Sequence, residues 1–403
     1  MAHNLPEEII HDILYRLPPK SLIICTSVCK PWNSMIKNPN FIRTHLSRTI
    51  DLNNQFGTHL LLVYCDRMVK HFSNTNGDIE EELLEGHYNL HYDNLAFDEY
   101  CKLEFPIVPK EELFNNVLKV VGICNGLVLL EDCKFFSGNT AMLCNPSTRK
   151  SVTLPKPHYP FKGDGGYYDY IGFGFGFDAV TNDYKVVRIT VDEWDDLSVS
   201  YEVYSLAAGS WSDPCSLDHI SGLERTCQTA FVNGAIHWLA FKRLTYGGSE
   251  DFILAFDVGS GSFRRIMTPE NLGSLCGEYL YISGYGKSIA LSKPHYSNIG
   301  EPCLDIWVMK EYGVEESWTK TTLCPAGPQR GVSYLPSCSR KSGDVVLKPI
   351  DGYWNDDERY GLACVDLVSK QLKSLGIHGY GHFYVESYVE SLVLLDKKDA
   401  VSY

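Results

Sequence analysis

The run GFGFGFD at residues 172–178 is the stretch whose composition most directly suggests chemistry, because a glycine-rich loop can cradle phosphate groups. A phosphate-binding loop of this kind joins a strand to a helix. Here a turn and the apolar run DYKVVRI (183–189) follow instead. We therefore interpret 172–178 as a β-strand, with Phe173, Phe175 and Phe177 on one face and the glycines on the other.

Histidines and cysteines, which could ligate a metal ion, do not occur at the spacings that metal sites use. His87/His91 and His378/His382 are four residues apart, but neither segment has a helical pattern and no HExxH motif is present. The 14 cysteines are scattered and form no CxxC pair. We therefore expect no metal and no cofactor, and we expect most of the cysteines to be reduced and half-buried.

The sequence also lacks a recognisable set of catalytic residues. It has no GxSxG motif, no Walker lysine and no pair of carboxylates at a diagnostic spacing. Asp178, Asp183, Asp257 and Asp366 lie near expected strand–turn boundaries, where an aspartate usually accepts hydrogen bonds from the turn backbone. The chain is thus predicted not to be an enzyme, and an enzyme or small-ligand site assembled from distant loops is the alternative.

Charge and hydropathy limit the kinds of partner. The formal net charge is −14, and no apolar run reaches the about 18 residues that a membrane span needs. Residues 1–50 hold 6 basic and 3 acidic side chains, which leaves 30 basic and 47 acidic ones for the rest. That acidic body would repel nucleic acid and attract a basic protein. Because no secretory signal pattern opens the chain, we expect a cytoplasmic location, with the nucleus as a second compartment.

Up to about residue 47 the apolar spacing predicts three short helices. Asn4 can cap the first helix and Pro6 suits its first turn, and a second and a third helix are expected from residue 20 and over 28–36. The apolar residues of the second helix point in nearly every direction. Helices this short do not form a stable domain alone. Their apolar surplus must be covered either by the rest of the chain or by another protein.

From about residue 59 the sequence alternates as strands do, and one unit of strand, polar turn and strand recurs. A bulky or apolar position after the turn repeats at intervals of 59, 52, 55 and 54 residues. A period of about 50 residues made of strands indicates a kelch-like β-propeller. With a first unit over 59–117, we predict six blades and a closing strand from 382–396. The repeated positions are Val152, Trp211, Phe263, Trp318 and Leu372.

Three expected loops, at 161–170, 191–196 and 351–360, combine aromatic and acidic residues. Exposed Tyr and Trp side chains bury a large area at little entropic cost, so these loops are candidates for binding a protein target. The alternative is that the aromatic residues fold back over their own blades. The candidate target-binding residues are Tyr167, Tyr168, Asp192, Trp194, Tyr353 and Trp354.

Residues 4–45 resemble an F-box. Leu-Pro, an acidic residue, paired aliphatics, a second Leu-Pro, Ser-Leu and Val-Cys-Lys-x-Trp occur in this order in LPEEIIHDILYRLPPKSLIICTSVCKPWNSMI. The remainder resembles the F-box-associated, kelch-like region of plant F-box proteins through CNGLVLL, CNPSTRK, FGFGFDAVTNDYKVVRI, VYSLAAGSWSD and IWVMKEYGVEESW. The ending SYVESLVLLD is similar to S-locus F-box proteins and their relatives. The resemblance implies an α+β multidomain fold, with an F-box over 1–48, a transition segment over 49–58 and a six-bladed propeller over 59–398.

The same resemblance implies a substrate-recognition subunit of an SCF-type E3 ubiquitin ligase. The F-box would bind a Skp adaptor, which connects to a cullin and a RING protein, and the propeller would bind the protein to be ubiquitinated. The S-locus likeness suggests secreted-type, commonly basic ribonucleases taken up by pollen tubes as targets. Ile10 and Leu17 are expected to hold the helices together, and Ile24-Cys25-Thr26 departs from the basic or aromatic residues often found there. Carried over by position, the adaptor-binding residues are Leu5, Pro6, Ile9, Ile13, Leu14, Leu22, Val28 and Trp32.

Overall fold

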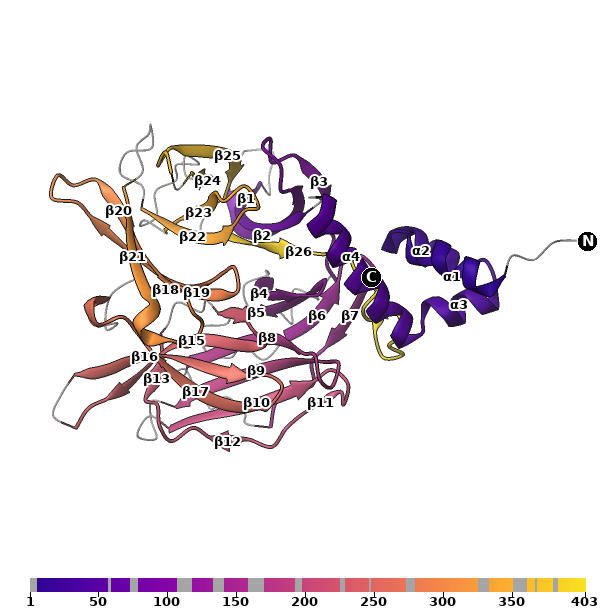
Figure 1. The fold of residues 1–403 in the computed structure, drawn as a ribbon, viewed down its shortest axis with the longest axis horizontal. Coiled ribbons are helices and arrows are strands. Elements are labelled where there is room, and N and C mark those ends of the chain that lie inside the picture. The colour runs from indigo at the N-terminus through magenta and orange to yellow at the C-terminus, as the bar shows by residue number, and fades with distance from the viewer. Residues whose placement is uncertain are drawn as a thin grey trace, which may run out of the picture.

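A computed structural model gives the fold, with helices in the N-terminal part and strands in almost all of the rest (Figure 1). No helix among the described residues is long and apolar enough to cross a membrane. The structure describes residues 6–56, 59–72, 79–106, 118–132, 141–158, 170–192, 198–224, 229–245, 248–272, 280–324, 333–350, 361–366, 368–379 and 383–403.

Four helices, rather than the three predicted, form the N-terminal unit. Pro6 is the N-cap of the first helix, and the predicted cap Asn4 lies outside the described residues. The segment predicted as a transition, 49–58, is helical up to Phe56, because the fourth helix is 18 residues long. The helices are α1 (Glu7–Tyr15), α2 (Pro19–Cys25), α3 (Lys30–Ile36) and α4 (Pro39–Phe56).

The first half of α4 completes the core of this helical unit. Phe41 stacks on Tyr15 with ring centroids 4.4 Å apart. His45 places its Nε2 atom 2.8 Å from the Leu17 carbonyl oxygen, which lies at the end of α1. The first three helices are too short to bury their apolar faces against one another. The helix α4 provides the additional apolar surface against which they pack. The buried aliphatic and aromatic residues are Leu14, Leu22, Ile36, Phe41, Ile42 and Leu46.

Six antiparallel sheets follow, and each is one blade of a propeller, as predicted. Blade 1 holds β26 (Phe383–Tyr388), β1 (Leu60–Phe72), β2 (Ile79–Tyr92) and β3 (Glu99–Lys102), and blade 2 holds β4 (Leu118–Cys124), β5 (Leu127–Asp132), β6 (Ala141–Asn145), β7 (Lys150–Thr153) and β27 (Val401–Ser402). Blade 3 holds β8 (Tyr170–Asp178), β9 (Asp183–Asp192), β10 (Ser198–Ser205), β11 (Ser210–Trp211) and β12 (Cys215–Ser216), and blade 4 holds β13 (Gly222–Leu223), β14 (Ala230–Val232), β15 (Ala235–Arg243), β16 (Ser249–Asp257) and β17 (Ser262–Met267). Blade 5 holds β18 (Tyr281–Tyr285), β19 (Ser288–Tyr296), β20 (Pro302–Met309) and β21 (Trp318–Leu323), and blade 6 holds β22 (Tyr334–Ser339), β23 (Val345–Pro349), β24 (Gly361–Val365) and β25 (Leu372–His378). Two short 3₁₀ helices, η2 (Glu270–Leu272) and η3 (Glu315–Ser317), lie between strands.

The ring is closed by a strand from the C-terminal end of the chain. β26 pairs antiparallel with β1, from Leu60 opposite Tyr388 to Cys65 opposite Phe383. The inner strands β26, β4, β8, β14, β18 and β22 then neighbour one another around the ring. This arrangement confirms the closing strand predicted within 382–396, and it pairs the edge of β1 that would otherwise invite association with other chains.

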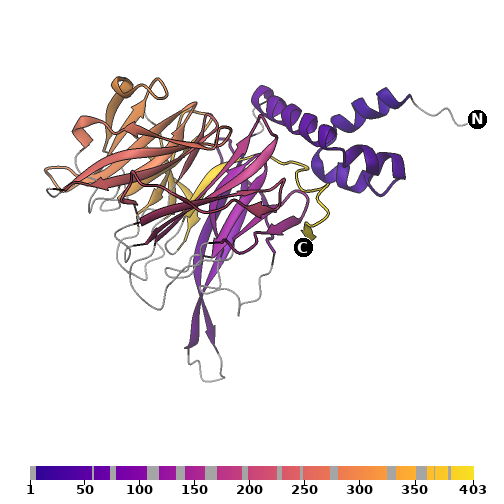
Figure 2. The same ribbon diagram turned by 90° about the horizontal axis from the view of Figure 1, so that it is seen from below.

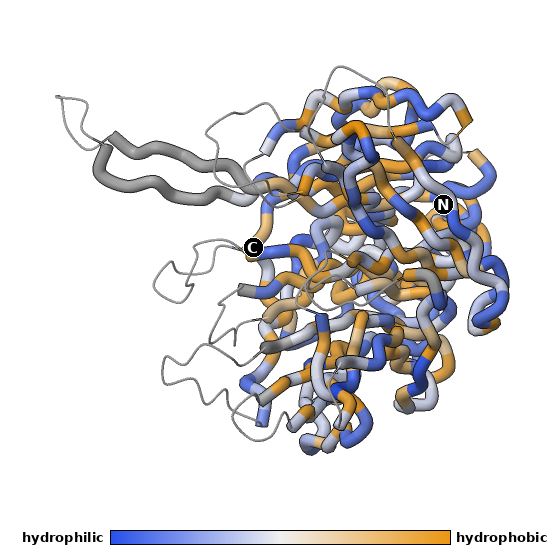
Figure 3. The backbone as a smooth tube through the Cα atoms, turned by 90° about the vertical axis from the view of Figure 1, so that its left-hand side faces the viewer, coloured by the Kyte–Doolittle hydropathy of each residue, from blue (hydrophilic) through white to orange (hydrophobic). Residues whose placement is uncertain are grey.

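The hydrophobic core is divided into six clusters, one between each pair of neighbouring blades. Several strands are buried along their whole length, such as β6 and β24, because neighbouring blades pack on both faces of a blade. Figure 3 shows hydrophobic residues throughout the propeller. The cluster between blades 2 and 3 also includes the core of the helical unit and the C-terminal residues 392–395. The helices therefore share one continuous core with the propeller.

The glycine-rich strand β8 confirms the structural interpretation of GFGFGFD. A Cβ atom on Gly174 would lie 2.3 Å from a ring carbon of Trp238, and one on Gly176 would lie 2.6 Å from a ring carbon of Phe231. The glycines thus allow blade 4 to pack closely on β8, while Phe173 and Phe175 are buried in the core. Close packing between blades 3 and 4 therefore accounts for the glycines of the run GFGFGFD.

The repeated bulky positions lie on the outer strands of blades 2 to 6 and join neighbouring blades. The indole nitrogen of Trp211 in β11 donates to the carbonyl of Pro155, just beyond the outer strand of blade 2, at 2.7 Å. Trp318 in β21 makes the corresponding bond to Met267 of blade 4 at 3.1 Å. The period in the sequence is therefore the period of these contacts between blades.

The C-terminal tail is fixed to blade 2 by a buried asparagine. The Asn145 side-chain nitrogen donates to the carbonyl of Ser391 at 3.1 Å and to that of Val393 at 2.7 Å. The tail also crosses Gly126, where an added Cβ would lie 2.5 Å from the Val389 carbonyl oxygen. Both contacts belong to the runs CNPSTRK and CNGLVLL. These two runs hold the segment that follows the closing strand.

The propeller has two faces with different structures. β1 starts directly after α4, so the strand ends at that side form a helix face, and the β1–β2 hairpin projects from the opposite hairpin face (Figure 2). Short turns such as 179–182 and 258–261 join strands at the helix face. The segments between β9 and β10 and between β23 and β24 begin and end at the hairpin face.

A carboxyl group on the closing strand has an unusual environment. Glu386 of β26 lies close to the hydroxyl of Tyr384, 3.5 Å away, and it interacts electrostatically with Cys124 of β4 and Cys338 of β22. Burial raises the pKa of Glu386 from 4.5 to about 7, more than its hydrogen bonds lower it. Folding therefore favours the protonated carboxyl.

We expect the free energy of unfolding to decrease as pH rises through about 7 because of this group. Its contribution is complete below the unfolded pKa of about 4.5 and is lost above the folded pKa. Glu386→Gln should therefore stabilise the protein at pH 8 by about 2 kcal/mol more than at pH 5. Urea unfolding at the two pH values measures this difference. An equal effect of the substitution at both values would contradict the assignment.

Candidate adaptor-docking surface

Six large aliphatic side chains are exposed among the described residues of the helical unit. Two of them, Ile50 and Leu52, lie in α4, and the other four lie in or near α1 and α2. Ile9 and Ile13 of α1 are 47% and 46% exposed, Ile24 of α2 is 72% exposed, and Val28 directly after α2 is 61% exposed. We call these four residues the docking patch. Exposed large apolar side chains on a small helical unit are typical of a protein–protein contact.

Helix periodicity explains why these side chains face outwards. Ile9 and Ile13 are four residues apart and so lie on one face of α1, while Leu14 points into the core and has no exposed surface. Ile24 lies in the last turn of α2 and Val28 in the turn that follows it, whereas Leu22 is fully buried. The apolar stripe of α1 is wider than the interior can cover, so its outer edge is exposed.

The structure divides the predicted adaptor-binding residues into two groups. Ile9, Ile13 and Val28 are exposed, Pro6 is exposed at the N-cap, Trp32 is half-buried against the core, and Leu5 lies outside the described residues. Leu14 and Leu22 were predicted to contact the adaptor, but both are 0% exposed. They hold the helices together, because no part of either side chain reaches the surface.

Ile24 was missed as a candidate contact, although it is the most exposed of the four. The sequence signal was present in the departure at Ile24-Cys25-Thr26, which stands where basic or aromatic residues are often found in the family that the sequence resembles. Ile10 and Leu17, predicted to hold the helices together, are half-buried against the core.

Charged residues on α1 and α4 fix the helices that carry the patch. Asp12 of α1 accepts from Arg16 at 2.7 Å and lies 3.9 Å from Arg48 of α4. The Asp12–Arg16 pair is exposed and of i,i+4 spacing, so each contact contributes only about 0.5 kcal/mol or less. These contacts orient α1 on α4 more than they stabilise the unit.

Two polar contacts join the helical unit to the propeller. Lys20 of α2 lies 3.9 Å from the Glu390 carboxylate and 5.1 Å from the centre of the Tyr100 ring. The Lys341 ammonium donates to the carbonyl of Asn54 in α4 at 3.1 Å. Burial raises the pKa of Glu390, and Lys20 opposes that rise. Together with the continuous core, these contacts fix the direction in which the docking patch faces relative to the propeller.

The predicted target-binding residues cannot be placed in the same way. Asp192 ends strand β9, and its side chain is not described. No group of three or more His, Cys, Asp or Glu side chains in the described part of the chain could hold a metal ion. The other predicted residues, which lie outside the described ranges, are Tyr167, Tyr168, Trp194, Tyr353 and Trp354.

Comparison with known protein families gives two matches that agree with these two units. Residues 3–44 match the F-box domain, and residues 105–397 match the F-box associated beta propeller domain. The second match covers more than half of the chain. It begins just after β3 and so leaves out β1–β3 of blade 1, and it ends in the C-terminal tail.

Relatives also match over most of the chain. F-box protein CPR1 of Arabidopsis thaliana is 28% identical over 427 residues, covering 98% of this chain and 90% of that protein. F-box/kelch-repeat protein At3g23880 of the same plant is 25% identical, covering 80% of each. Among solved structures, Aleuria aurantia lectin aligns with a TM-score of 0.38 at 11% identity, over 79% of this chain and 96% of the lectin, a likeness too weak to support an argument.

An F-box followed by a six-bladed ring is the architecture of a substrate-recognition protein, in which one unit joins the ligase and the other selects a protein. The helical unit, the closed propeller and the two family matches agree in both order and extent. This chain belongs to the F-box-associated β-propeller family, as an F-box substrate-recognition protein of the type typical of SCF E3 ligases.

Proposed function

We propose that the docking patch binds a Skp-type adaptor, and that the chain thereby becomes the substrate-recognition subunit of an SCF complex with cullin and RING components. The observation that carries this proposal is the exposure of Ile9, Ile13, Ile24 and Val28 on the face of the F-box that does not pack on the propeller. Full burial of each such side chain contributes about 1.5–3 kcal/mol. Four of them would offset a substantial part of the about 4–15 kcal/mol that association costs, and other contacts would supply the rest.

The mechanism we propose is proximity, with no bond made or broken by this chain. The propeller holds a target protein, and the cullin arm brings a ubiquitin-charged enzyme close to its lysines, so their effective concentration rises. The fixed joint through Lys20, Glu390 and Lys341 would keep the distance between adaptor and target constant. Rigid positioning of this kind favours transfer to particular lysines of the target.

Reconstitution tests the assignment directly. The full chain, a purified Skp-type adaptor, a cullin–RING pair and a ubiquitin-charged enzyme should ubiquitinate proteins captured by the propeller in a plant extract. A chain with Ile13→Asp and Val28→Asp serves as the control, since removing residues 1–48 would cut α4 and expose its core. Equal ubiquitination with both chains would overturn the proposal.

For the target, we propose a basic protein of the secreted ribonuclease class, as in S-locus relatives. Residues 51–403 contain 30 basic and 47 acidic side chains, which favours a cationic partner. Binding to a basic ribonuclease should weaken steeply as salt is raised, because the attraction is screened over about 10 Å at 0.1 M salt. Titration of the full chain with ribonucleases of high and low pI measures this dependence. Salt-independent binding, or expression throughout leaves and roots rather than in pollen, would favour another target.

A further inference from the structure

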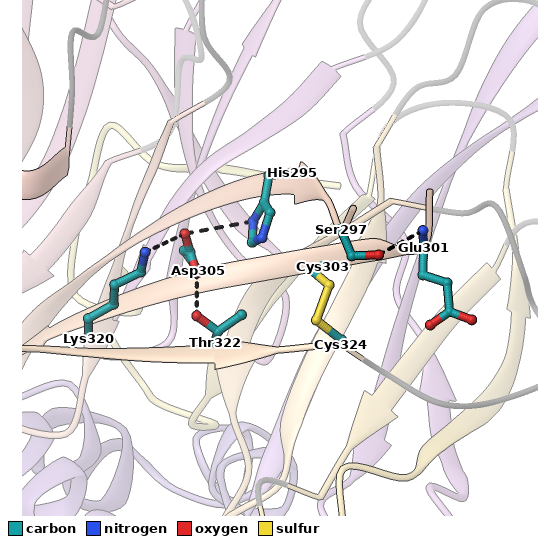
Figure 4. Close-up of a disulfide and its surroundings, with 8 residues drawn as sticks. All are labelled: His295, Ser297, Glu301, Cys303, Asp305, Lys320, Thr322 and Cys324. Carbon is teal, nitrogen blue, oxygen red and sulfur yellow. Dashed lines mark hydrogen bonds and ion pairs between the residues drawn. A yellow bond between two sulfur atoms is a disulfide. The ribbon is translucent and has the colours of Figure 1, made fainter. Parts of the chain in front are cut away.

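Two cysteines of blade 5 are joined in a disulfide at the rim of the hairpin face (Figure 4). Cys303 at the start of β20 and Cys324 just after β21 are bonded, with Cα atoms 4.2 Å apart. The residues next to them, Leu304 and Leu323, are directly opposed in the ladder. Nine other described cysteines are free thiols. Most of the described cysteines are therefore reduced, as expected, and Cys303 and Cys324 are the exception among them.

The disulfide joins strands that other interactions already hold together. The β20–β21 ladder runs from Leu304 opposite Leu323 to Met309 opposite Trp318. Beside the disulfide, Asp305 of β20 accepts from Lys320 at 2.7 Å and from Thr322 at 2.5 Å. A cross-link stabilises a protein mainly by restricting the unfolded chain. In the folded blade, the ladder and the contacts of Asp305 hold the two strands together whether or not the bond is present. Reduction should therefore leave the blade folded.

The two cysteine residues differ in their exposure to solvent. Cys303 is only 4% exposed, whereas Cys324 is exposed at the rim. An external thiolate can therefore approach Cys324, and the exposed sulfur of a disulfide is the one that exchange reactions attack. By contrast, Cys144 and Cys338 are buried, and burial raises the pKa of each well above its usual value. Those two thiols are suited to packing rather than to redox chemistry.

The neighbouring turn carries apolar side chains into solvent. Tyr296 at the end of β19 is 62% exposed, and Ile299 in the β19–β20 turn is 80% exposed. The register places His295 opposite Cys303, so the turn begins one residue beyond the disulfide. The Ser297 and Glu301 backbones bond across the turn at 2.8 Å. Any change in the ends of β20 and β21 is transmitted directly to this exposed pair.

We propose that Cys303–Cys324 is a reversible thiol–disulfide site that exchanges with glutathione-class thiols and controls the order of the blade 5 rim. One glutathione thiolate attacks Sγ of Cys324, the S–S bond breaks, and Cys303 leaves as a thiolate that takes up a proton. A second glutathione attacks the mixed disulfide and releases the Cys324 thiol. Two electrons pass from two glutathione molecules to the protein disulfide, and oxidised glutathione is the product. This inference does not rest on adaptor docking.

Differential alkylation of the full chain in glutathione buffers of defined ratio tests the chemistry. Cys303 and Cys324 should be bonded in oxidised buffer and both alkylated in reduced buffer, while the exposed free Cys215 is alkylated throughout. Thermal unfolding should shift by less than about 4 °C between the two states. A pair that never forms the bond, or that stays bonded in the reduced native protein, would overturn the proposal.

Hydrogen exchange tests the consequence for the rim. Amides of 296–303 and 318–324 should exchange about tenfold faster in the reduced state, because local opening no longer works against a covalent link. Cys324→Ser should show the fast exchange even in oxidised buffer, and Cys215→Ser should behave as wild type. Equal exchange in both redox states, with the bond shown to be broken, would reject control of the rim.

Discussion

Replacing Ile13 and Val28 together by aspartate should abolish binding to a Skp-type adaptor while leaving the protein folded. Both side chains are about half exposed in the free chain, so the new carboxylates stay in water and the helical unit keeps its core. In the complex each aspartate would be buried against apolar surface, and each lost aliphatic contact removes about 1.5–3 kcal/mol. The dissociation constant should increase by at least about 100-fold.

Calorimetric titration with the purified adaptor measures this loss, and circular dichroism checks the fold. Ile299→Asp is the matched control, because Ile299 is 80% exposed on the hairpin face of blade 5, away from the F-box. It should bind the adaptor as the unmodified chain does. If the double variant also bound with unchanged affinity, the docking patch would not be the adaptor site.

Leu14→Asp separates contact from folding. Leu14 has no exposed surface, so a carboxylate there would be buried without a partner, at a cost of about 4 kcal/mol or more. Adaptor binding should be lost together with the ordered helices. The change therefore reports on the F-box core, not on the interface that the sequence pattern assigned to it.

This distinction could not be drawn from the sequence. The 3.6-residue period identifies a broad apolar stripe on α1, but it does not say which edge of the stripe the chain covers itself. That depends on Phe41 and Tyr15, whose stacking joins α4 to α1 across about 26 residues of sequence. Leu14 and Ile13 are neighbours in sequence, and tertiary packing alone assigns one to the core and one to the surface.

The helix α4 was not among the three predicted helices, and its second half was assigned largely to a transition segment for a similar reason. The sequence SRTIDLNNQF is mostly polar and lacks the apolar face that predicts a helix. The first half is held by Phe41, Ile42 and Leu46 in the core, and a helix that has begun adds further turns at little cost. The polar half therefore continues a helix that packing starts elsewhere.

The propeller could be predicted because equivalent contacts between neighbouring blades recur at a regular spacing in the sequence. Each blade must pack on the next with the same geometry, so the position of Trp211 and Trp318 recurs at nearly equal intervals. The closing strand was predictable because a ring of this kind needs one. A pairing of two cysteines across β20 and β21 was not, because it depends on the register of a ladder that spacing alone does not set.

Deleting residues 383–403 should prevent the whole chain from folding. The deletion removes β26, exposes the edge of β1, and takes Phe383, Val385 and Tyr388 out of two clusters between blades. It also removes the tail that Asn145 holds and the buried residues 392–395 that join the F-box core. Burial of seven apolar side chains is lost, at about 1.5–3 kcal/mol each. That sum, about 10–21 kcal/mol, is as large as the about 5–15 kcal/mol by which domains are usually stable.

Size-exclusion chromatography and thermal melting of residues 1–382 test this expectation, with aggregation as the expected result because an open strand edge pairs with other chains. Val385→Asp places a charge in the same cluster and should destabilise the intact chain severely, since Val385 is 1% exposed. Ser387→Asp on the same strand is the matched control, because Ser387 is exposed. A cooperative transition of 1–382 at the melting temperature of the intact chain would show that the ring does not depend on its C-terminal strand. That result would contradict our expectation that folding of the ring and of the F-box core depends on residues 383–403, because this deletion removes the closing strand, the tail and the tail's contribution to the F-box core together.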